Sequence, residues 1–132
     1  VSGIGTVGGL VGMNNGKVIR CYSTGKPTGS SNVGGLCGSK DTGSSYEDTG
    51  NFWDIQTSQM PASAMGTGKT TAQMKSISTF TSAGWDFMDV WGIVENQTYP
   101  YLQIQPSADL NHDGRVDLAD FALFAAQWLE GI

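Results

Sequence analysis

The chain has 132 residues, which is the size of a single domain, and a formal net charge of −5 at neutral pH. No segment reaches the ~18 consecutive apolar residues of a membrane-spanning helix, and no basic patch could release counterions from a nucleic acid. The sequence therefore predicts neither membrane insertion nor a nucleic-acid partner.

A glycine-rich repeat begins the chain. The hexapeptide Val-Gly-Gly-Leu-Val-Gly at 7–12 returns as Val-Gly-Gly-Leu-Cys-Gly at 33–38, a shift of 26 residues. A fixed period between about 20 and 50 residues predicts a solenoid or another repeat array. Within the repeat, residues 9–11 and 17–22 are predicted strands, with a turn at 14–17 that contains Asn-Gly. Short strands joined by glycine-rich corners favour a β-solenoid, because glycine lets the backbone bend sharply and approach its neighbour.

The repeats VGGLVGMNNGKVIRCYSTG and VGGLCGSKDTGSSYEDTG resemble the GLUG motif over about residues 1–50. This resemblance implies an adhesin-type β-helix of the kind found in secreted or surface-attached, mostly bacterial proteins. It supplies architecture and no catalytic residues. We therefore expect a structural or adhesion module, with a surface glycan as a possible partner.

Cys21 and Cys37 leave two alternatives open. A disulfide between them would add roughly 3 kcal/mol by restricting the unfolded chain. Two cysteines are too few to indicate a disulfide framework, so buried free thiols are an equal alternative.

The pattern changes after residue 54. Residues 56–69 are polar and rich in turn formers, and Gly-Lys-Thr at 68–70 lacks the glycine that a phosphate-binding loop needs at 63. A capping box at 70–73 predicts a helix over about 71–80, with Met74, Ile77 and Phe80 on one face, acting as a lid.

Aromatic residues dominate the next segment. Trp85, Phe87 and Trp91 surround a predicted strand at 90–94, and residues 99–102 close the segment. An open solenoid end exposes strand edges, so this segment is predicted to be a cap. Its tryptophans could bind sugar rings, but packing in the core is favoured, because they lie among other apolar residues. Asn96-Gln97-Thr98 is a glycosylation sequon in a predicted turn.

The acidity of the chain is concentrated at its C-terminal end, where five acidic side chains follow residue 106 against Arg115 alone. Carboxylates and carboxamides fall at positions 1, 3, 5, 9 and 12 of a loop that has Gly114 at position 6. That spacing, with only hard oxygen donors, predicts a calcium site in which Arg115 contributes its carbonyl. The predicted ligands are Asp109, Asn111, Asp113, Arg115, Asp117 and Asp120.

This loop differs from an EF-hand. Position 12 is Asp120 where an EF-hand has glutamate, and prolines at 100 and 106 prevent an entering helix. The pattern D-x-N-x-D-G-x-V-x-x-x-D with an exiting helix resembles one repeat of a dockerin, over 109 to about 129. The resemblance implies calcium binding and docking onto a cohesin-like partner.

The predicted helix at 118–129 is apolar nearly all round, so it must be buried on several sides. Its partner could be the cap, another protein or a further copy of this chain. The apolar residues of one face are Leu118, Phe121, Ala122, Ala125, Trp128 and Leu129.

No catalytic constellation is predicted. Asp48 with Asp54, and Asp86 with Asp89, are the candidate carboxylate pairs, but such pairs are common in sequences. His112, which is the only histidine, lies in the predicted calcium loop and leaves no Ser-His-Asp set.

The predicted fold is mainly β: a short β-solenoid with an aromatic-rich cap over residues 1–106, followed by a calcium loop and helix over 107–132. The preferred function is a non-catalytic extracellular structural or adhesion module that docks through its calcium-ordered helix. One alternative is a subunit of a self-assembling extracellular filament, in which the mid-coil start of the chain and the C-terminal helix make head-to-tail contacts. Another is a fragment of a secreted polysaccharide-degrading enzyme. Calcium dependence and low charge density indicate an extracellular or cell-surface location, and the resemblance to the GLUG motif implies a bacterial source.

Overall fold

The computed structural model describes residues 1–43 and 45–103. The chain divides into two units, Val1–Tyr101 and Leu102–Ile132, and the fold reported below is that of the first. Its described residues are mainly β, which confirms the predicted class. We call the first four strands the first layer and the next four the second layer. They are β1 (Thr6–Gly8), β2 (Val11–Asn14), β3 (Lys17–Ile19) and β4 (Tyr22–Ser23), then β5 (Ser31–Gly34), β6 (Cys37–Lys40), β7 (Glu47–Thr49) and β8 (Phe52–Asp54).

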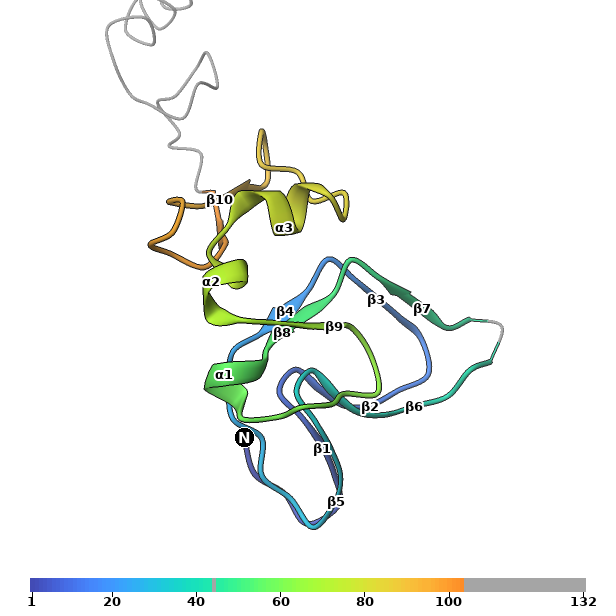
Figure 1. Ribbon diagram of the computed structural model, residues 1–132. Coiled ribbons are helices and arrows are strands. Elements are labelled where there is room, and N and C mark those ends of the chain that lie inside the picture. Colours follow the sequence, from blue (N-terminus) through green and yellow to red (C-terminus); the bar gives the residue numbers. More distant parts are fainter. Residues whose placement is uncertain (44, 104–132) are drawn as a thin grey trace, which may run out of the picture. The chain divides into compact units, whose positions relative to one another are not determined.

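The two layers pair in parallel, strand by strand (Figure 1). β1 pairs with β5, β2 with β6, β3 with β7 and β4 with β8. Val7 lies opposite Val33 and Val11 opposite Cys37, so the predicted 26-residue register is confirmed for the first half of each layer.

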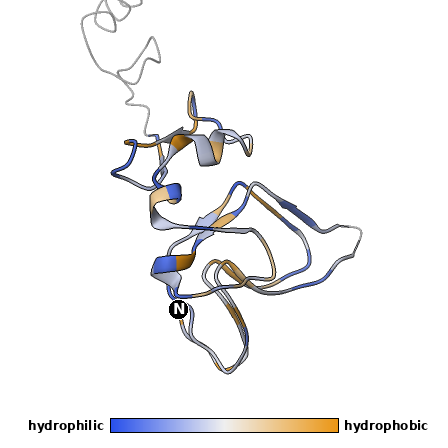
Figure 2. Cartoon of the chain, viewed as in Figure 1, coloured by the Kyte–Doolittle hydropathy of each residue, from blue (hydrophilic) through white to orange (hydrophobic). Residues whose placement is uncertain are grey.

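The register changes halfway round the layer. Lys17 lies opposite Glu47 and Tyr22 opposite Phe52, a shift of 30 residues. The corner between β2 and β3 contains two residues, whereas residues 41–46 form the matching corner of the second layer and add four. The corner absorbs these extra residues, and the strands after it still pair. β7 carries Glu47 and Asp48 and is coloured as hydrophilic in Figure 2.

The predicted strand at 9–11 is confirmed only at Val11, where β2 begins, because Gly9 and Leu10 form the corner between β1 and β2. Their amides donate hydrogen bonds to the second layer, from Gly9 N to Gly34 O at 3.3 Å and from Leu10 N to Leu36 O at 2.9 Å. The predicted turn after β2 is confirmed: Asn14 accepts a hydrogen bond from Gly16 N at 3.1 Å through Oδ1. The predicted strand at 17–22 is interrupted at Arg20, which has a φ of 52°.

Residues 62–69, which we call the third layer, stack on the second. Gly35 N donates to Ala62 O at 3.0 Å, and Ala64 N donates to Cys37 O at 2.9 Å. β9 (Thr67–Lys69) then pairs in parallel with β8, with Phe52 opposite Thr67. The short helix α1 (Ile55–Ser58) connects β8 to this segment. The third layer lacks the Val-Gly-Gly-Leu pattern, which is why the sequence did not reveal it.

The single helix predicted at 71–80 is two helices, α2 (Thr71–Met74) and α3 (Ile77–Thr81). The predicted capping box is present at Thr70 and Gln73. Glu95, far away in the sequence, accepts hydrogen bonds from Ile77 N at 2.7 Å and from the Ser76 hydroxyl at 2.9 Å. These contacts give α3 its own start and separate it from α2.

The aromatic segment packs against the side of the layers. Its cluster consists of buried Phe52, Met74, Phe80 and Trp85, with Tyr22, Ala83, Phe87, Trp91, Ile93 and Tyr99 packed around them. Because side chains alternate along a strand, Trp53 next to Phe52 belongs to the opposite core, with Leu36, Cys37 and Met65. The cluster therefore contacts the first layer through Tyr22 and the second through Phe52. We predicted that the aromatic segment caps the open end of the solenoid; it lies beside the strands instead (Figure 1).

The predicted strand at 90–94 is shorter than expected. β10 (Trp91–Gly92) pairs with β11 (Tyr101–Leu102). The turn predicted at the sequon is present at Asn96, which has a φ of 62°.

Candidate functional site

The predicted calcium ligands and the helix that follows them lie outside the described residues. The calcium loop with Asp109, Asn111, Asp113, Arg115, Asp117 and Asp120 stays a prediction, as does the division into 1–106 and 107–132. Within 1–43 and 45–103, no group of three or more His, Cys, Asp or Glu side chains is arranged to hold a metal.

Asp54 is the buried ionic centre of the described fold, with no exposed surface. Its Oδ1 accepts hydrogen bonds from Gln56 N at 2.8 Å and Thr57 N at 3.1 Å, which caps α1. Its Oδ2 accepts from the Thr71 hydroxyl at 2.7 Å and the Tyr99 hydroxyl at 2.8 Å. One carboxylate therefore ties β8, both neighbouring helices and the aromatic segment together.

These contacts set the ionisation of the group. Burial alone would raise the pKa of Asp54, but the hydrogen bonds from Thr71, Tyr99, Thr57 and Gln56 more than offset it, and the pKa lies below its ordinary value. Burial, followed by the hydrogen bond to Asp54, raises the pKa of Tyr99. The pair is thus held as carboxylate and neutral phenol.

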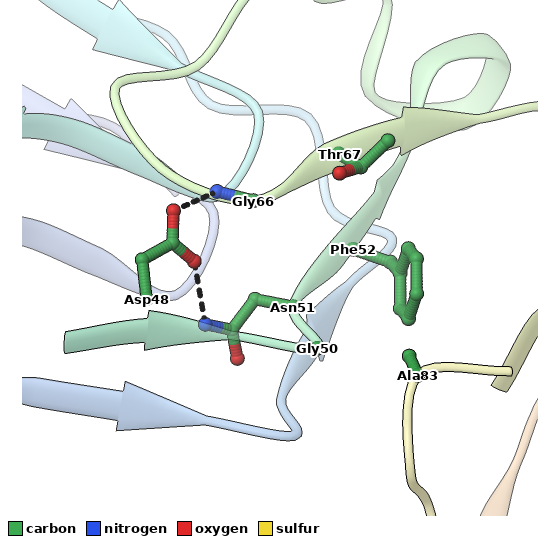
Figure 3. A pocket seen from close by; sticks show the side chains of 7 residues that line it. All are labelled: Asp48, Gly50, Asn51, Phe52, Gly66, Thr67 and Ala83. Carbon is green, nitrogen blue, oxygen red and sulfur yellow. Dashed lines mark hydrogen bonds between the residues drawn. The ribbon is translucent and has the colours of Figure 1, made fainter. Parts of the chain in front are cut away.

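Asp48 lines an open depression of about 260 Å³ between the layers and the aromatic segment (Figure 3). Its carboxylate accepts hydrogen bonds from Asn51 Nδ2 at 2.8 Å and from Gly66 N in the third layer at 2.9 Å. The Asn51 side chain also bonds to the first layer, where it accepts from Cys21 N at 2.9 Å and donates to Val18 O at 2.6 Å. The polar groups of this depression therefore hold three layers together.

The candidate catalytic acids have structural contacts. Asp48 and Asp54 hold backbone amides and hydroxyls, and the Asp86 carboxylate accepts from Met88 N at 2.8 Å and Asp89 N at 3.0 Å. None of these contacts tests catalysis, and the expectation that the chain is not an enzyme stays a prediction.

The tryptophans of the aromatic segment pack among apolar neighbours, as predicted, and so does Trp53. Trp53 is 6% and Trp85 4% exposed, and their indole N–H groups donate to Met60 O at 3.0 Å and Gly50 O at 2.7 Å. Trp91 lies 4.5 Å from Trp85, measured between ring centroids. Both described cysteines are free thiols. Cys37 is buried and donates to Ser39 O at 2.9 Å, and burial raises its pKa.

The outer side of the first layer carries no paired strand in the described part of the chain. Among the described strands, β1, β2, β3 and β4 each pair with the second layer on one side only. We call their other side the first-layer edge. Leu10, at its Gly-Gly-Leu corner, is 46% exposed, whereas Leu36 at the same position of the second layer is 0% exposed.

Comparison with known proteins shows a similar bacterial sequence. The chain is 45% identical over 101 residues to a protein of Evansella cellulosilytica named "Putative Gly-rich membrane protein". The match covers 74% of this chain and 12% of that protein, so the chain spans about an eighth of its relative's length. No family model and no solved structure matches the chain.

The relative's name contradicts the predicted extracellular or cell-surface location, and that prediction is wrong. It rested on low charge density and a calcium loop, features that a repeat segment of a membrane protein can share with a secreted protein. No helix in the described part of the chain is long and apolar enough to cross a bilayer. The GLUG-like and dockerin-like resemblances stay predictions.

Proposed function

We propose that this chain is a non-catalytic structural module: a short β-solenoid, braced along one side by an aromatic segment, within a longer glycine-rich polypeptide. The observation that carries the proposal is the parallel stacking of three successive layers, in which equivalent residues of the first two layers lie opposite one another. In a solenoid each repeat contacts its neighbours and stability is approximately the sum of repeat and interface terms.

Two further observations support a structural role. The carboxylates that a hydrolase would need hold neighbouring segments together, as Asp48 does for Gly66 and Asp54 for Thr71. The similar glycine-rich protein of Evansella cellulosilytica is several times longer than the matched region, as expected if such layers belong to a longer array.

We further propose that the dockerin-like loop binds calcium and orders the helix at 118–129. The motif spacing and the concentrated C-terminal acidity support this proposal. Calcium would neutralise that acidity and fix the first turn of an apolar helix that needs a partner. The partner is a protein, either a cohesin-like receptor or a further copy of this chain.

Cysteine cross-linking tests the stacked layers. In a Cys21→Ser background, Met13→Cys with Ser39→Cys should form a disulfide under mild oxidation, because these residues are opposite one another. Ile19→Cys with Thr49→Cys should do so as well, across the 30-residue register. Paired strands lie about 4.8 Å apart, which is within the Cα separation that a disulfide requires. Mass spectrometry of non-reduced digests identifies the links.

The control variants pair each new cysteine with the partner from the other sheet. Met13→Cys with Thr49→Cys, and Ile19→Cys with Ser39→Cys, combine the same four substitutions across different sheets and should not cross-link. Equal yields from matched and exchanged pairs would contradict the solenoid.

Calcium binding is tested by isothermal titration calorimetry on the full chain. We expect the Asp113→Ala variant to lose more affinity than the roughly 10–100-fold cost of removing an outer-shell partner, because it removes a direct ligand. Chelation should increase hydrogen exchange in residues 109–132 and leave the β signal of the layers in circular dichroism unchanged.

Asp41→Ala is the matched control, because Asp41 is an exposed acid in the corner between β6 and β7. It removes the same charge and should keep the full calcium affinity. If chelation changes neither the exchange nor the assembly state, calcium does not order this segment.

A further inference from the structure

The first-layer edge has the same Gly-Gly-Leu corner that forms the interface between the second and third layers. The amide of Gly9 donates to Gly34 O, and the amide of Gly35 donates to Ala62 O, so the same corner position bonds to the following layer twice in succession. Gly34 O in turn corresponds to Gly8 O one repeat earlier. A layer in front of the first would find the matching acceptor at Gly8.

The surroundings of the two corner leucines, Leu10 and Leu36, also differ by one layer. Leu36 is held between two layers: its carbonyl accepts from Leu10 N at 2.9 Å and Val11 N at 3.1 Å, and its amide donates to Ser63 Oγ in the third layer at 3.1 Å. Among the described residues, Leu10 has a layer on one side only, and 46% of its surface is exposed against 0% for Leu36. One more layer would bring Leu10 into the environment of Leu36.

The corner permits that close approach. A Cβ atom on Gly8 would lie 2.6 Å from Leu36 O, and one on Gly34 would lie 3.1 Å from the Cα of Ser63. Both layers therefore have glycine where the next backbone passes. The occupant of the first-layer edge must be a segment whose own backbone can come equally close.

We propose that the first-layer edge binds a preceding Val-Gly-Gly-Leu repeat of the same polypeptide, which pairs in parallel with β1–β4 and covers Leu10. This inference rests on the proposed solenoid and names its partner. A second copy stacked end to end fits less well, because its third layer presents Ala62 and Ser63 in place of a Gly-Gly-Leu corner.

The test uses the full chain and an extended chain in which residues 7–32 are repeated in tandem ahead of Val7. In the extended chain, the first copy of Leu10 lies at the new edge and the second copy lies between layers. Leu10→Ala in the second copy should lower the urea midpoint by roughly 1–2 M, as expected for a buried leucine. Leu36→Ala in the present chain is the benchmark for that shift.

The same substitution in the first copy, or in the present chain, should shift the midpoint by less than a third as much, because that leucine is half exposed. Equal shifts in the two copies, or rapid proteolysis of the added repeat with the rest intact, would overturn the inference. Failure of the Met13–Ser39 cross-link would instead overturn the solenoid itself, so the two failures are distinguishable.

Analytical ultracentrifugation of the unextended chain tests whether a second copy of the chain binds the first-layer edge. We expect no self-association through the first-layer edge. The sedimentation coefficient should therefore be the same for the parent and for Leu10→Asp. A concentration-dependent dimer that Leu10→Asp abolishes would assign the edge to a second copy and overturn the choice of a preceding repeat.

Discussion

Replacing Gly34 with alanine is expected to destabilise the stacked layers by at least about 3 kcal/mol, the upper end of the usual cost of overpacking a core. A Cβ atom at this position would lie 1.9 Å from the carbonyl oxygen of Cys37 and 3.1 Å from the Cα of Ser63 in the third layer. Both neighbours are backbone atoms, which cannot rotate away as a side chain can. The second layer would have to separate from the third, or its corner would have to open.

Gly25→Ala is the control for this substitution. An added Cβ at Gly25 meets nothing within 4 Å, so the variant should be as stable as the parent or up to about 1 kcal/mol more stable. Urea denaturation followed by circular dichroism measures both. Similar midpoints for the two variants would show that the close approach at Gly34 does not exist in solution.

Removing the Asp54 carboxylate is expected to cost about 3 kcal/mol, because hydrogen bonds to a charged group contribute more than neutral ones and a helix cap is lost with them. Asp54→Ala leaves the donors of Gln56, Thr57, Thr71 and Tyr99 without their buried acceptor. Asp41→Ala removes an equal charge from an exposed position and should change the free energy of unfolding by less than about 0.5 kcal/mol. Thermal and urea unfolding compare the two variants.

The pH dependence of stability gives a second measurement of the same contact. The pKa of Asp54 is lowered in the folded state, so its contribution to stability is fully present above the pKa of an unfolded aspartate. That contribution is lost as the pH falls from there through the lowered folded value. The difference in stability between the parent and Asp54→Ala should therefore shrink as the solution is acidified below about pH 4. A difference that stays constant from pH 7 to pH 2 would contradict the buried carboxylate network.

At alkaline pH, the stability of the fold is expected to change in the opposite direction, falling as the pH rises. The pKa of Tyr99 is raised by burial and by its hydrogen bond to Asp54, so the folded state favours the neutral phenol. Its contribution is complete below the pKa of an unfolded tyrosine and is lost as the pH rises through the raised folded value. The two residues thus stabilise the link between β8 and the aromatic segment over the whole range between these limits.

The sequence predicted correctly those features that depend on interactions between neighbouring residues or between identical repeats. The 26-residue register follows from a hexapeptide that recurs, the turn after β2 from the Asn14 side chain, and the start of α2 from the Thr70 capping box. Each of these features depends on contacts within a few residues or on an identical segment in the next repeat. The calcium loop is a local pattern of the same kind, although it lies outside the described residues.

Features that depend on distant partners were predicted wrongly or not at all. The break between α2 and α3 depends on Glu95, and the place of the aromatic segment depends on Tyr22 and Phe52. The third layer has no sequence pattern of its own, because it is aligned by hydrogen bonds from the Gly35 corner.

The sequence by itself determined a repeating, mainly β chain with glycine at its corners, because the period and the side chains that form turns are properties of neighbouring residues. Only the tertiary structure decided which acids accept hydrogen bonds from distant segments and which leucine is covered. Those outcomes depend on what packs against each residue. Asp54 meets Tyr99 across 45 positions of the chain. Leu10 and Leu36 both follow Val-Gly-Gly, yet Leu10 is 46% exposed and Leu36 is 0% exposed.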